Sequence, residues 1–503
     1  MNLKLKSVLQ WVLARPMKML VLAVTAIVSI GMTGYVVRLN HEPGSQQRYL
    51  IQAPMAHPYA GRNLIGWLTQ NGFDVAGFSW RDGVVEVVTD QAGVQQLNAH
   101  GLRTVLRPDV THGIFGLNSI DPRYLNPTTV ESGLKALNAQ FPAITHLEQI
   151  GTSLQGRPIW ALLISSTPDL TSGKMYEKPA IIFDGMHHAR EIMTPEIVMD
   201  VAQTLLGAVA AQSPGAMAVL QRWNVWVVPM LNVDGNNLVW TKDSMWRKNA
   251  HGDHGSVYGV DINRNYPFKW ASCGGSSGNA NAQDFHGASG ASEPETQAMM
   301  RLGQLAQPTG SLSYHSYSEL VLYPYGWNGV LSGENALLAK IGSELAAILP
   351  ADSGRGNYTP GTPWQILYSV DGDSMSYLHS EFGATALTFE VNQDFLPPYS
   401  LREPTLQKHR KAWQYFINRM ETNLFSLRVT DSRRAGPVQA RIEISTLPHQ
   451  YGEKPFHTNP AGNFFKVLDP GTYAIRVTLA DGRTAESSVV MQGHGQAVQV
   501  QVP

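Results

Sequence analysis

The stretch at residues 181–196, IIFDGMHHAREIMTPE, limits what this chain can fold into more than any other stretch. Residues 180–183 are apolar and β-branched, which is typical of a buried strand. Residues 194–196 offer a helix N-cap, a proline at the first helical position and an acid in the first turn, ahead of an apolar helix at 197–210. Residues 184–193 are therefore expected in a loop at the carboxyl end of a strand, where open α/β sheets bind ligands.

This loop contains His187, His188 and Glu191. A histidine and a glutamate three positions apart can direct an imidazole nitrogen and a carboxylate at one point, and two histidines with one glutamate form a known catalytic zinc site that keeps one position open. The same spacing also occurs in solvated loops, so the pair alone is not diagnostic. A second predicted strand, SLSYHSY at 311–317, ends in a further candidate ligand, His315.

Six sequence motifs occur in a fixed order along the chain. They are HARE (188–191), WRKN (246–249), GVDINRN (259–265), HGASGASEPET (286–296), SYHSYSELVLYPYG (313–326) and ALTFE (386–390). In this order they resemble the zinc metallocarboxypeptidases of the carboxypeptidase A/B type, peptidase family M14, over about residues 121–420. The resemblance implies a zinc-dependent enzyme that hydrolyses the C-terminal peptide bond of its substrate.

The resemblance also implies the metal site. Its motif spacing selects His188 rather than His187, so the expected ligands of one zinc ion are His188, Glu191 and His315. His187 is then expected to pack within the loop. Asp261 corresponds to the carboxylate that orients the first zinc histidine in the family.

Two further residues are expected to carry the chemistry. Glu390 ends an apolar strand, where an unpaired carboxylate would be costly to bury, so a functional position is favoured. The resemblance assigns Glu390 as the general base for the hydrolytic water and as the proton donor to the leaving amine. It assigns Arg247 to stabilisation of the oxyanion.

An enzyme that removes terminal residues must recognise a free carboxylate. Asn263 and Arg264 offer an amide and a guanidinium fork for this purpose, in a loop that the family motifs place near the metal. Tyr368 matches the mobile tyrosine that covers the bound substrate in the family. Arg190 and Tyr317 are expected to border the next subsite.

Asp373 is the candidate for selecting the terminal side chain. The family pocket lies after the covering tyrosine, and an acid there selects Lys or Arg. Alignment backwards from Tyr377 puts Asp373 at the selecting position, whereas alignment forwards from Tyr368 does not, because this segment is two residues shorter than usual. The alternative is that residues 371–373 form a tight turn with solvated carboxylates.

The chain divides into three predicted folded parts. Residues 48–107 show the βαββαβ order of a ferredoxin-like domain, and the resemblance places an inhibitory pro-domain of this kind here; a permanently attached companion domain is the alternative. Residues 121–423 alternate strands and helices, which predicts an α/β domain with a mixed, mostly parallel sheet and helices on both faces. Residues 425–503 contain short strands separated by Gly, Pro and Asp turns, which predicts a β-sandwich that resembles transthyretin-like domains.

The segment before these domains suggests a membrane location. Residues 19–37 form an uncharged run long enough to span a bilayer, and the residues before it, 1–18, carry four basic side chains. Residues 1–18 are therefore expected in the cytoplasm, with the catalytic part outside, which in a Gram-negative bacterium is the periplasm. The alternative is a signal peptide that is cleaved to give a secreted enzyme.

The predicted function is a zinc carboxypeptidase that acts on peptide or protein C-termini. One alternative is a cell-wall peptidase that cuts at diaminopimelate in murein peptides, and another is a non-catalytic envelope protein that uses zinc to hold a peptide end. The presence of Glu390 and Arg247 disfavours the non-catalytic protein, since binding alone requires neither. A net charge of −1 gives no electrostatic case for nucleic acid, and a single cysteine excludes an intrachain disulfide.

Overall fold

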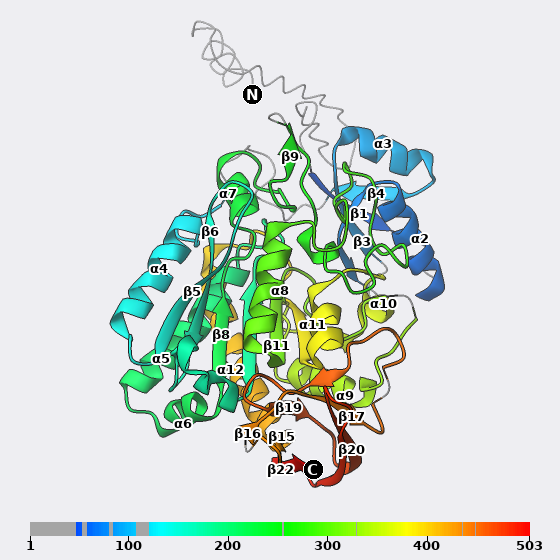
Figure 1. The fold of residues 1–503 in the computed structure, drawn as a ribbon. Helices are drawn as coiled ribbons and strands as arrows, with labels where there is room; N and C mark the ends of the chain where they lie inside the picture. The colour runs from blue at the N-terminus through cyan, green and yellow to red at the C-terminus, as the bar shows by residue number, and fades with distance from the viewer. Residues whose placement is uncertain are drawn as a thin grey trace, which may run out of the picture.

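The computed structural model describes residues 47–52, 58–79, 84–106, 120–253, 256–327, 329–434, 436–447 and 449–503. The predicted membrane segment at 19–37 lies outside these residues. Within them, no helix combines the length and apolar character required to cross a bilayer. Figure 1 shows a large central α/β part, with the small N-terminal part in blue at one end and the C-terminal part in orange and red at the other.

The N-terminal domain is a four-stranded antiparallel sheet with two helices. Along the chain its elements are β1 (Gln47–Gln52), α2 (Pro58–Gln70), β2 (Asp74–Ser79), β3 (Val84–Thr89), α3 (Gln91–Ala99) and β4 (Arg103–Leu106). The strand order β2-β3-β1-β4 is that of a ferredoxin-like fold, which agrees with the βαββαβ pattern of the sequence. Strand β2 lies at the edge of this sheet.

The central domain contains an eight-stranded mixed sheet in the order β13-β12-β14-β11-β7-β8-β6-β5. Strands β7, β8, β11 and β14 run parallel at its centre, and β7 and β11 are buried along their whole length, as expected for strands covered on both sides. The strands are β5 (Thr145–Thr152), β6 (Pro158–Ile164), β7 (Ala180–Gly185), β8 (Asn224–Val228), β11 (Pro308–His315), β12 (Leu320–Leu322), β13 (Thr359–Gly361) and β14 (Thr385–Glu390); a short hairpin pairs β9 (Gly252–Asp253) with β10 (Ser256–Val257).

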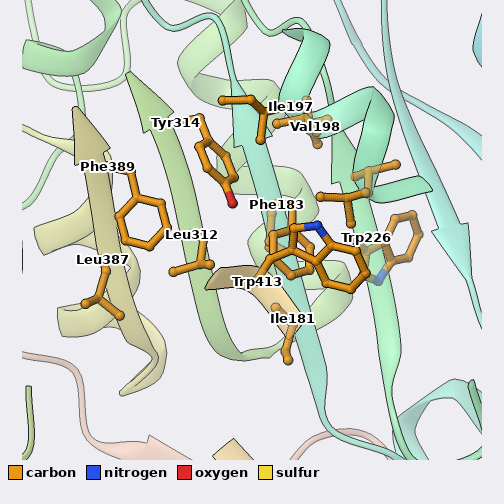
Figure 2. Packing of buried hydrophobic residues seen from close by; sticks show 14 of the residues in the cluster. Ile181, Phe183, Ile197, Val198, Trp226, Leu312, Tyr314, Leu387, Phe389 and Trp413 are labelled. Carbon is orange, nitrogen blue, oxygen red and sulfur yellow. The ribbon is translucent and has the colours of Figure 1, made fainter. Parts of the chain in front are cut away.

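Helices cover both faces of this sheet, as the alternating sequence pattern predicts. Helices α5 and α12 pack together on one face, and α8 and α11 pack on the other. Figure 2 shows the first face, where Trp413 of α12 lies against Phe183 of the sheet, with ring centroids 6.3 Å apart. The helices are α4 (Pro127–Gln140), α5 (Thr194–Ala210), α6 (Pro214–Arg222), α7 (Val233–Thr241), α8 (Pro294–Ala306), α9 (Asn335–Ala347), α10 (Pro363–Ile366), α11 (Ser374–Phe382) and α12 (Arg402–Thr422).

Strand β11 determines where the site forms. It pairs in parallel with β7 on one side and with β14 on the other, so the three strands end at the same edge of the sheet. The register places His315, the last residue of β11, opposite Glu390, the last residue of β14. The loop that follows β7 begins beside them, because Gly185 pairs with Tyr314.

The C-terminal part consists of two small sheets around a separate apolar core, which agrees with the predicted β-sandwich. Its strands are β15 (Leu424–Asp431), β16 (Gly436–Pro437), β17 (Ala440–Ile444), β18 (Phe456–His457), β19 (Asn463–Val467), β20 (Gly471–Leu479), β21 (Thr484–Met491) and β22 (Gln496–Val502). Lys466 of β19 is buried against the central domain, where its Nζ lies 2.8 Å from Glu334 Oε2 and donates to the Gly383 carbonyl. The ion pair holds the sandwich to the start of α9, and the hydrogen bond holds it to the end of α11.

One local prediction was wrong. Thr194 is not the N-cap of α5, because the helix begins at Thr194 itself and Met193 precedes it. The Thr194 hydroxyl instead accepts a hydrogen bond from Met186 N at 3.0 Å and donates one to Glu191 O at 2.8 Å. These bonds hold the metal-ligand loop closed onto the start of the helix.

Candidate active site

Three side chains at the sheet edge converge on one point. His188 and Glu191 come from the loop after β7, and His315 comes from the end of β11. One ligand atom from each lies within 4.8 Å of the others, and all three residues are buried. His188 Nδ1 lies 2.7 Å from Glu191 Oε1, and His315 Nδ1 lies 3.2 Å from Glu191 Oε2.

The donor set fits a zinc ion. The Nδ1 atoms of His188 and His315 are 3.1 Å apart, and two imidazole lone pairs at this distance repel unless a proton or a cation lies between them. Burial lowers the pKa of His315 to about 4, which keeps its ring neutral, the form that binds a metal. Burial opposes ionisation of Glu191, but the adjacent histidines hold the pKa of this carboxyl below its usual range. Two neutral imidazoles and one carboxylate are the His₂Glu set of catalytic zinc sites.

Asp261 connects the metal site to the neighbouring arginine. Its Oδ1 lies 3.1 Å from His188 Nε2, which leaves Nδ1 of the same ring free to face the metal position. Its Oδ2 accepts hydrogen bonds from Arg247 Nη2 at 2.8 Å and Nε at 3.2 Å. Although burial acts in the opposite direction, Arg247 and His188 hold the pKa of Asp261 well below its usual range.

His187 lies behind the metal ligands and points away from them. Its Nε2 is 2.9 Å from the Tyr266 hydroxyl, and its Nδ1 is 3.3 Å from Asp184 Oδ1. The His187 and His315 rings stack with centroids 5.2 Å apart. His187 therefore packs within the loop, as expected, and supports the ring of His315.

Glu390 lines the same cleft as His188, Glu191 and Arg247. Burial and the negative charge of Glu191 raise the pKa of Glu390 well above its usual range, while Arg247 and Arg264 act in the opposite direction. A carboxylate with a raised pKa beside a metal position can accept and return a proton near neutral pH.

The predicted carboxylate-reading residues also lie in this cleft. Asn263, Arg264 and Tyr368 line it, and the Arg264 guanidinium carbon lies 5.9 Å from the centre of the Tyr368 ring. Arg264 Nη1 donates to the Asn263 carbonyl at 2.8 Å, and within the described residues its Nε has no hydrogen-bond partner. The guanidinium thus keeps donor capacity for a ligand.

Asp373 lines the cleft and is also the N-cap of α11. Its Oδ1 accepts a hydrogen bond from Ser376 N at 2.8 Å, so the residue has a structural role. Apolar side chains of Leu322, Leu367 and Met375 line the same space. Burial raises the pKa of Asp373, as expected for a carboxylate in largely apolar surroundings. The carboxylate is buried and not solvated, which excludes the solvated-turn alternative.

The N-terminal domain closes the cleft from outside. Val75 and Ala76 of β2 line it beside His188 and Glu191, and the remaining space is about 50 Å³. The predicted subsite residues are covered: Arg190 forms an ion pair with Asp74, and the Tyr317 hydroxyl donates to Glu86.

Several residues that shape the site had no motif to identify them in the sequence. Asp74 and Glu86 belong to another domain, and only their acidic character was visible. Asp371 and Ser276 lie far apart in the chain but are joined by a hydrogen bond. An acidic residue three positions after Tyr368 was the available signal for Asp371.

Two imidazoles and a carboxylate around one point, with a second carboxylate and two arginines in the same cleft of a mixed α/β sheet, define a metal-dependent hydrolase. Residues 130–412, more than half of the chain, match the zinc carboxypeptidase family, and the chain belongs to that family.

Relatives of known name agree with this assignment. The chain is 28% identical to human carboxypeptidase O over 286 residues, which cover 56% of this chain and 74% of the relative. It is 31% identical to a metallocarboxypeptidase A-like protein of Trichophyton verrucosum over 247 residues, which cover 48% of this chain and 56% of the fungal protein. The crystal structure of carboxypeptidase A from Helicoverpa armigera has the same fold, with a TM-score of 0.62 at 21% identity over 74% of this chain and 96% of the insect chain.

Proposed function

We propose that this zinc carboxypeptidase removes C-terminal residues with basic side chains from peptides. The main support for this proposal is Asp373, a buried carboxylate in a cleft that is also lined by Leu322, Leu367 and Met375. A terminal Lys or Arg would pair with this carboxylate, whereas an apolar side chain would leave it buried and unpaired. We expect this difference to favour basic termini by ~10²-fold or more.

The residues of the cleft supply the steps of peptide hydrolysis. His188, Glu191 and His315 would hold the zinc ion, which when bound supplies a Lewis acid and lowers the pKa of nearby water. Glu390 accepts the proton of the attacking water and passes it to the leaving amine nitrogen. Arg247, held by Asp261, donates hydrogen bonds to the oxygen on which negative charge develops.

Three residues, Asn263, Arg264 and Tyr368, are assigned to recognition of the C-terminal end of the substrate. Arg264 and Asn263 orient the terminal carboxylate, for which the guanidinium fork has the right geometry. Tyr368 covers the bound end and excludes water. An internal peptide bond or an amidated end lacks the carboxylate and leaves the buried guanidinium without its partner.

A peptide panel tests this function. Peptides that end in Arg, Lys, Phe, Leu or diaminopimelate, each with a free and an amidated terminus, are assayed with and without a chelator. We expect hydrolysis of free termini only, fastest for Arg and Lys, and complete loss with the chelator. Equal cleavage of amidated peptides would overturn the terminal-residue assignment, and a preference for diaminopimelate would support the cell-wall alternative.

Asp373→Asn separates the charge from the structural role of this residue. Asparagine caps helices as well as aspartate, so α11 keeps its first turn while the negative charge is removed. We expect kcat/KM for Arg-ending peptides to fall toward the value for Leu-ending peptides. A native preference for Phe or Leu would refute the basic pocket without affecting the zinc site.

The N-terminal domain is proposed to keep the enzyme inactive. This rests on the narrow space beside Val75 and Ala76 and on the two contacts that cover Arg190 and Tyr317. Because the domain lines the cleft and pairs with both predicted subsite residues, it must move before a peptide can reach them. Assays of the panel should therefore include Asp74→Ala beside the native protein.

We place the enzyme outside the cytoplasm, anchored by residues 19–37. The support is the uncharged run itself and the four basic residues before it, Lys4, Lys6, Arg15 and Lys18. Cell fractionation with an antibody against the catalytic part tests this. Recovery with membranes supports the anchor, recovery in the medium supports a cleaved signal, and recovery with cytoplasmic proteins refutes both.

A further inference from the structure

A short segment runs from Tyr368 to Asp373. Tyr368 is proposed to cover the C-terminal end of the substrate, and Asp373 is proposed to bind the side chain of the terminal residue. The backbone of this segment is held on two sides: Val370 N donates to Gly326 O at 2.9 Å, and Tyr266 N donates to Gly372 O at 2.9 Å. Gly372 has a φ of +65°, and a Cβ there would lie 2.4 Å from Arg264 O. The segment therefore packs directly against the backbone of the carboxylate-reading loop.

Asp371 lies in this segment, and its side chain contacts the loop at residues 271–281. Its carboxylate, on a residue only 1% exposed, accepts hydrogen bonds from Cys273 N at 2.9 Å and Gly275 N at 3.3 Å. It also accepts a hydrogen bond from the Ser276 hydroxyl. Three donors from one loop thus converge on one buried carboxylate, and hydrogen bonds to a carboxylate are among the stronger ones in proteins.

Ser276 extends this contact to His286. Ser276 Oγ lies 2.8 Å from His286 Nδ1. Because the hydroxyl proton is directed at Asp371, the histidine must donate to Ser276, which fixes its proton on Nδ1. The His286 ring packs edge-on against Trp270, with centroids 4.7 Å apart. The series of hydrogen bonds from Asp371 through Ser276 therefore ends at the His286 ring, which Trp270 holds in place.

Non-covalent contacts alone hold this loop, and those of Asp371 are the ones that join it to the segment at 368–373. The chain has one cysteine, Cys273, so a disulfide cannot anchor residues 271–281. The loop also lies close against the substrate segment: a Cβ on Gly275 would be 2.7 Å from Val370 Cα. Release of the loop would thus free one side of the segment that contains Tyr368 and Asp373.

We propose that Asp371 is a positioning residue for recognition of the substrate terminus. It ties the 271–281 loop to the segment at 368–373 and so fixes Tyr368 and Asp373 relative to Arg264. It acts through these residues and does not touch the reacting atoms. The inference rests on the proposed carboxypeptidase function, whose recognition step it deepens.

The test compares zinc-loaded native enzyme with Asp371→Ala, Ser276→Ala and a control, Asp200→Ala. Asp200 is a buried carboxylate of the same domain that binds Arg410 on the helical layer, away from the cleft. The measurements are kcat and KM for an Arg-ending peptide, the ratio of kcat/KM between Arg- and Leu-ending peptides, zinc content, and the rate of limited proteolysis within residues 271–281.

We expect Asp371→Ala to raise KM about tenfold and to narrow the Arg-to-Leu ratio, with a smaller change in kcat and full zinc content. Ser276→Ala should also raise KM and narrow the Arg-to-Leu ratio, but by less than Asp371→Ala does. Proteolysis of the loop should accelerate in both variants. Asp200→Ala should lower thermal stability but leave KM, the ratio and the loop cleavage rate as in the native enzyme.

The outcomes separate this inference from the proposed function. A purely structural role would lower kcat in proportion to the inactive fraction and leave KM unchanged, and this result would overturn the inference. Unchanged proteolysis of the loop would also overturn it, whether or not peptides are cleaved. If Asp371→Ala does not fold, Ser276→Ala decides, since it removes one hydroxyl. Failure of both the native enzyme and the Asp74→Ala variant to cleave any free-terminus peptide would refute the proposed function itself.

Discussion

Asp74 of the N-terminal domain and Arg190 of the metal-ligand loop form a buried ion pair, with Arg190 Nη2 2.9 Å from Asp74 Oδ1. Arg190 directly precedes the metal ligand Glu191, and its guanidinium carbon lies 4.0 Å from the centre of the Phe395 ring. Through this ion pair, the N-terminal domain binds the loop that supplies two of the three metal ligands.

Asp74→Ala should increase peptidase activity. Loss of one partner from a buried ion pair costs about 3–5 kcal/mol, and here the cost falls on the docked state, because Arg190 becomes solvated when the domain moves away. We expect the initial rate on Arg-ending peptides to rise at least tenfold. Gln95→Ala, on the exposed face of α3, is the matched control and should behave as the native protein. Equal rates for all three proteins would contradict an inhibitory role.

Replacement of any metal ligand should remove zinc and activity together. His188→Ala, Glu191→Ala and His315→Ala each leave two of three ligands in a buried site, so zinc measured by elemental analysis should fall well below one per chain. His187→Ala should retain stoichiometric zinc, with a loss of stability of a few kcal/mol because the buried ring is removed. Full zinc content in the His315→Ala protein would disprove the ligand assignment.

Glu390→Gln should retain zinc and substrate binding but lose turnover. The amide has the same shape and cannot accept the proton of the attacking water, and general base catalysis contributes about 10²–10⁴-fold. Single-turnover kinetics and calorimetric peptide binding measure the two properties separately. A variant with near-native kcat would remove Glu390 from the mechanism.

Glu295→Gln should stabilise the protein at high pH. Burial raises the pKa of Glu295 to about 7, despite a hydrogen bond of 3.1 Å from Asn249 Nδ2. Between its ordinary pKa of 4.5 and 7, the folded state binds more protons than the unfolded state, so the stability of the native protein falls as pH rises through this window. The loss amounts to ~3 kcal/mol at pH 8.

Thermal unfolding of the zinc-loaded proteins at pH 5 and pH 8 checks the Glu295 prediction. The gain in Tm of Glu295→Gln over native protein should be larger at pH 8. Glu403→Gln, on an exposed face of α12, makes the same charge change and is the control. Its effect on Tm should be the same at pH 5 and at pH 8. A gain from Glu295→Gln that does not depend on pH would contradict the raised pKa.

The sequence predicted the metal site well because its positions are set by local patterns. His315 and Glu390 each end an apolar strand, and strands of this kind end at the same edge of a parallel sheet. The family motifs then separated His188 from His187, which spacing alone could not do. The three-part organisation was similarly visible in the change from alternating helices and strands to short strands with turns.

Other features depend on contacts between distant residues, which no local pattern contains. The N-cap of α5 was misplaced because Thr194 satisfies Met186 N and Glu191 O instead of its own helix. Strand β12 has three residues and is defined by its neighbours in the sheet. The roles of Asp74 and Asp371 follow from partners that lie 116 and 95 residues away.

The pairing of His315 with Glu390 on neighbouring strands has a consequence for how such enzymes diversify. The separation between a metal ligand and the proposed base is set by the backbone pairing of β11 and β14, two inner strands of the eight-stranded sheet. The residues that recognise the substrate lie on loops and on the first turn of α11. Loops can therefore accept insertions, shortening or exchange, as in the short segment between Tyr368 and Tyr377, while the reaction centre keeps its geometry. New specificities can arise in this architecture by change at the periphery alone.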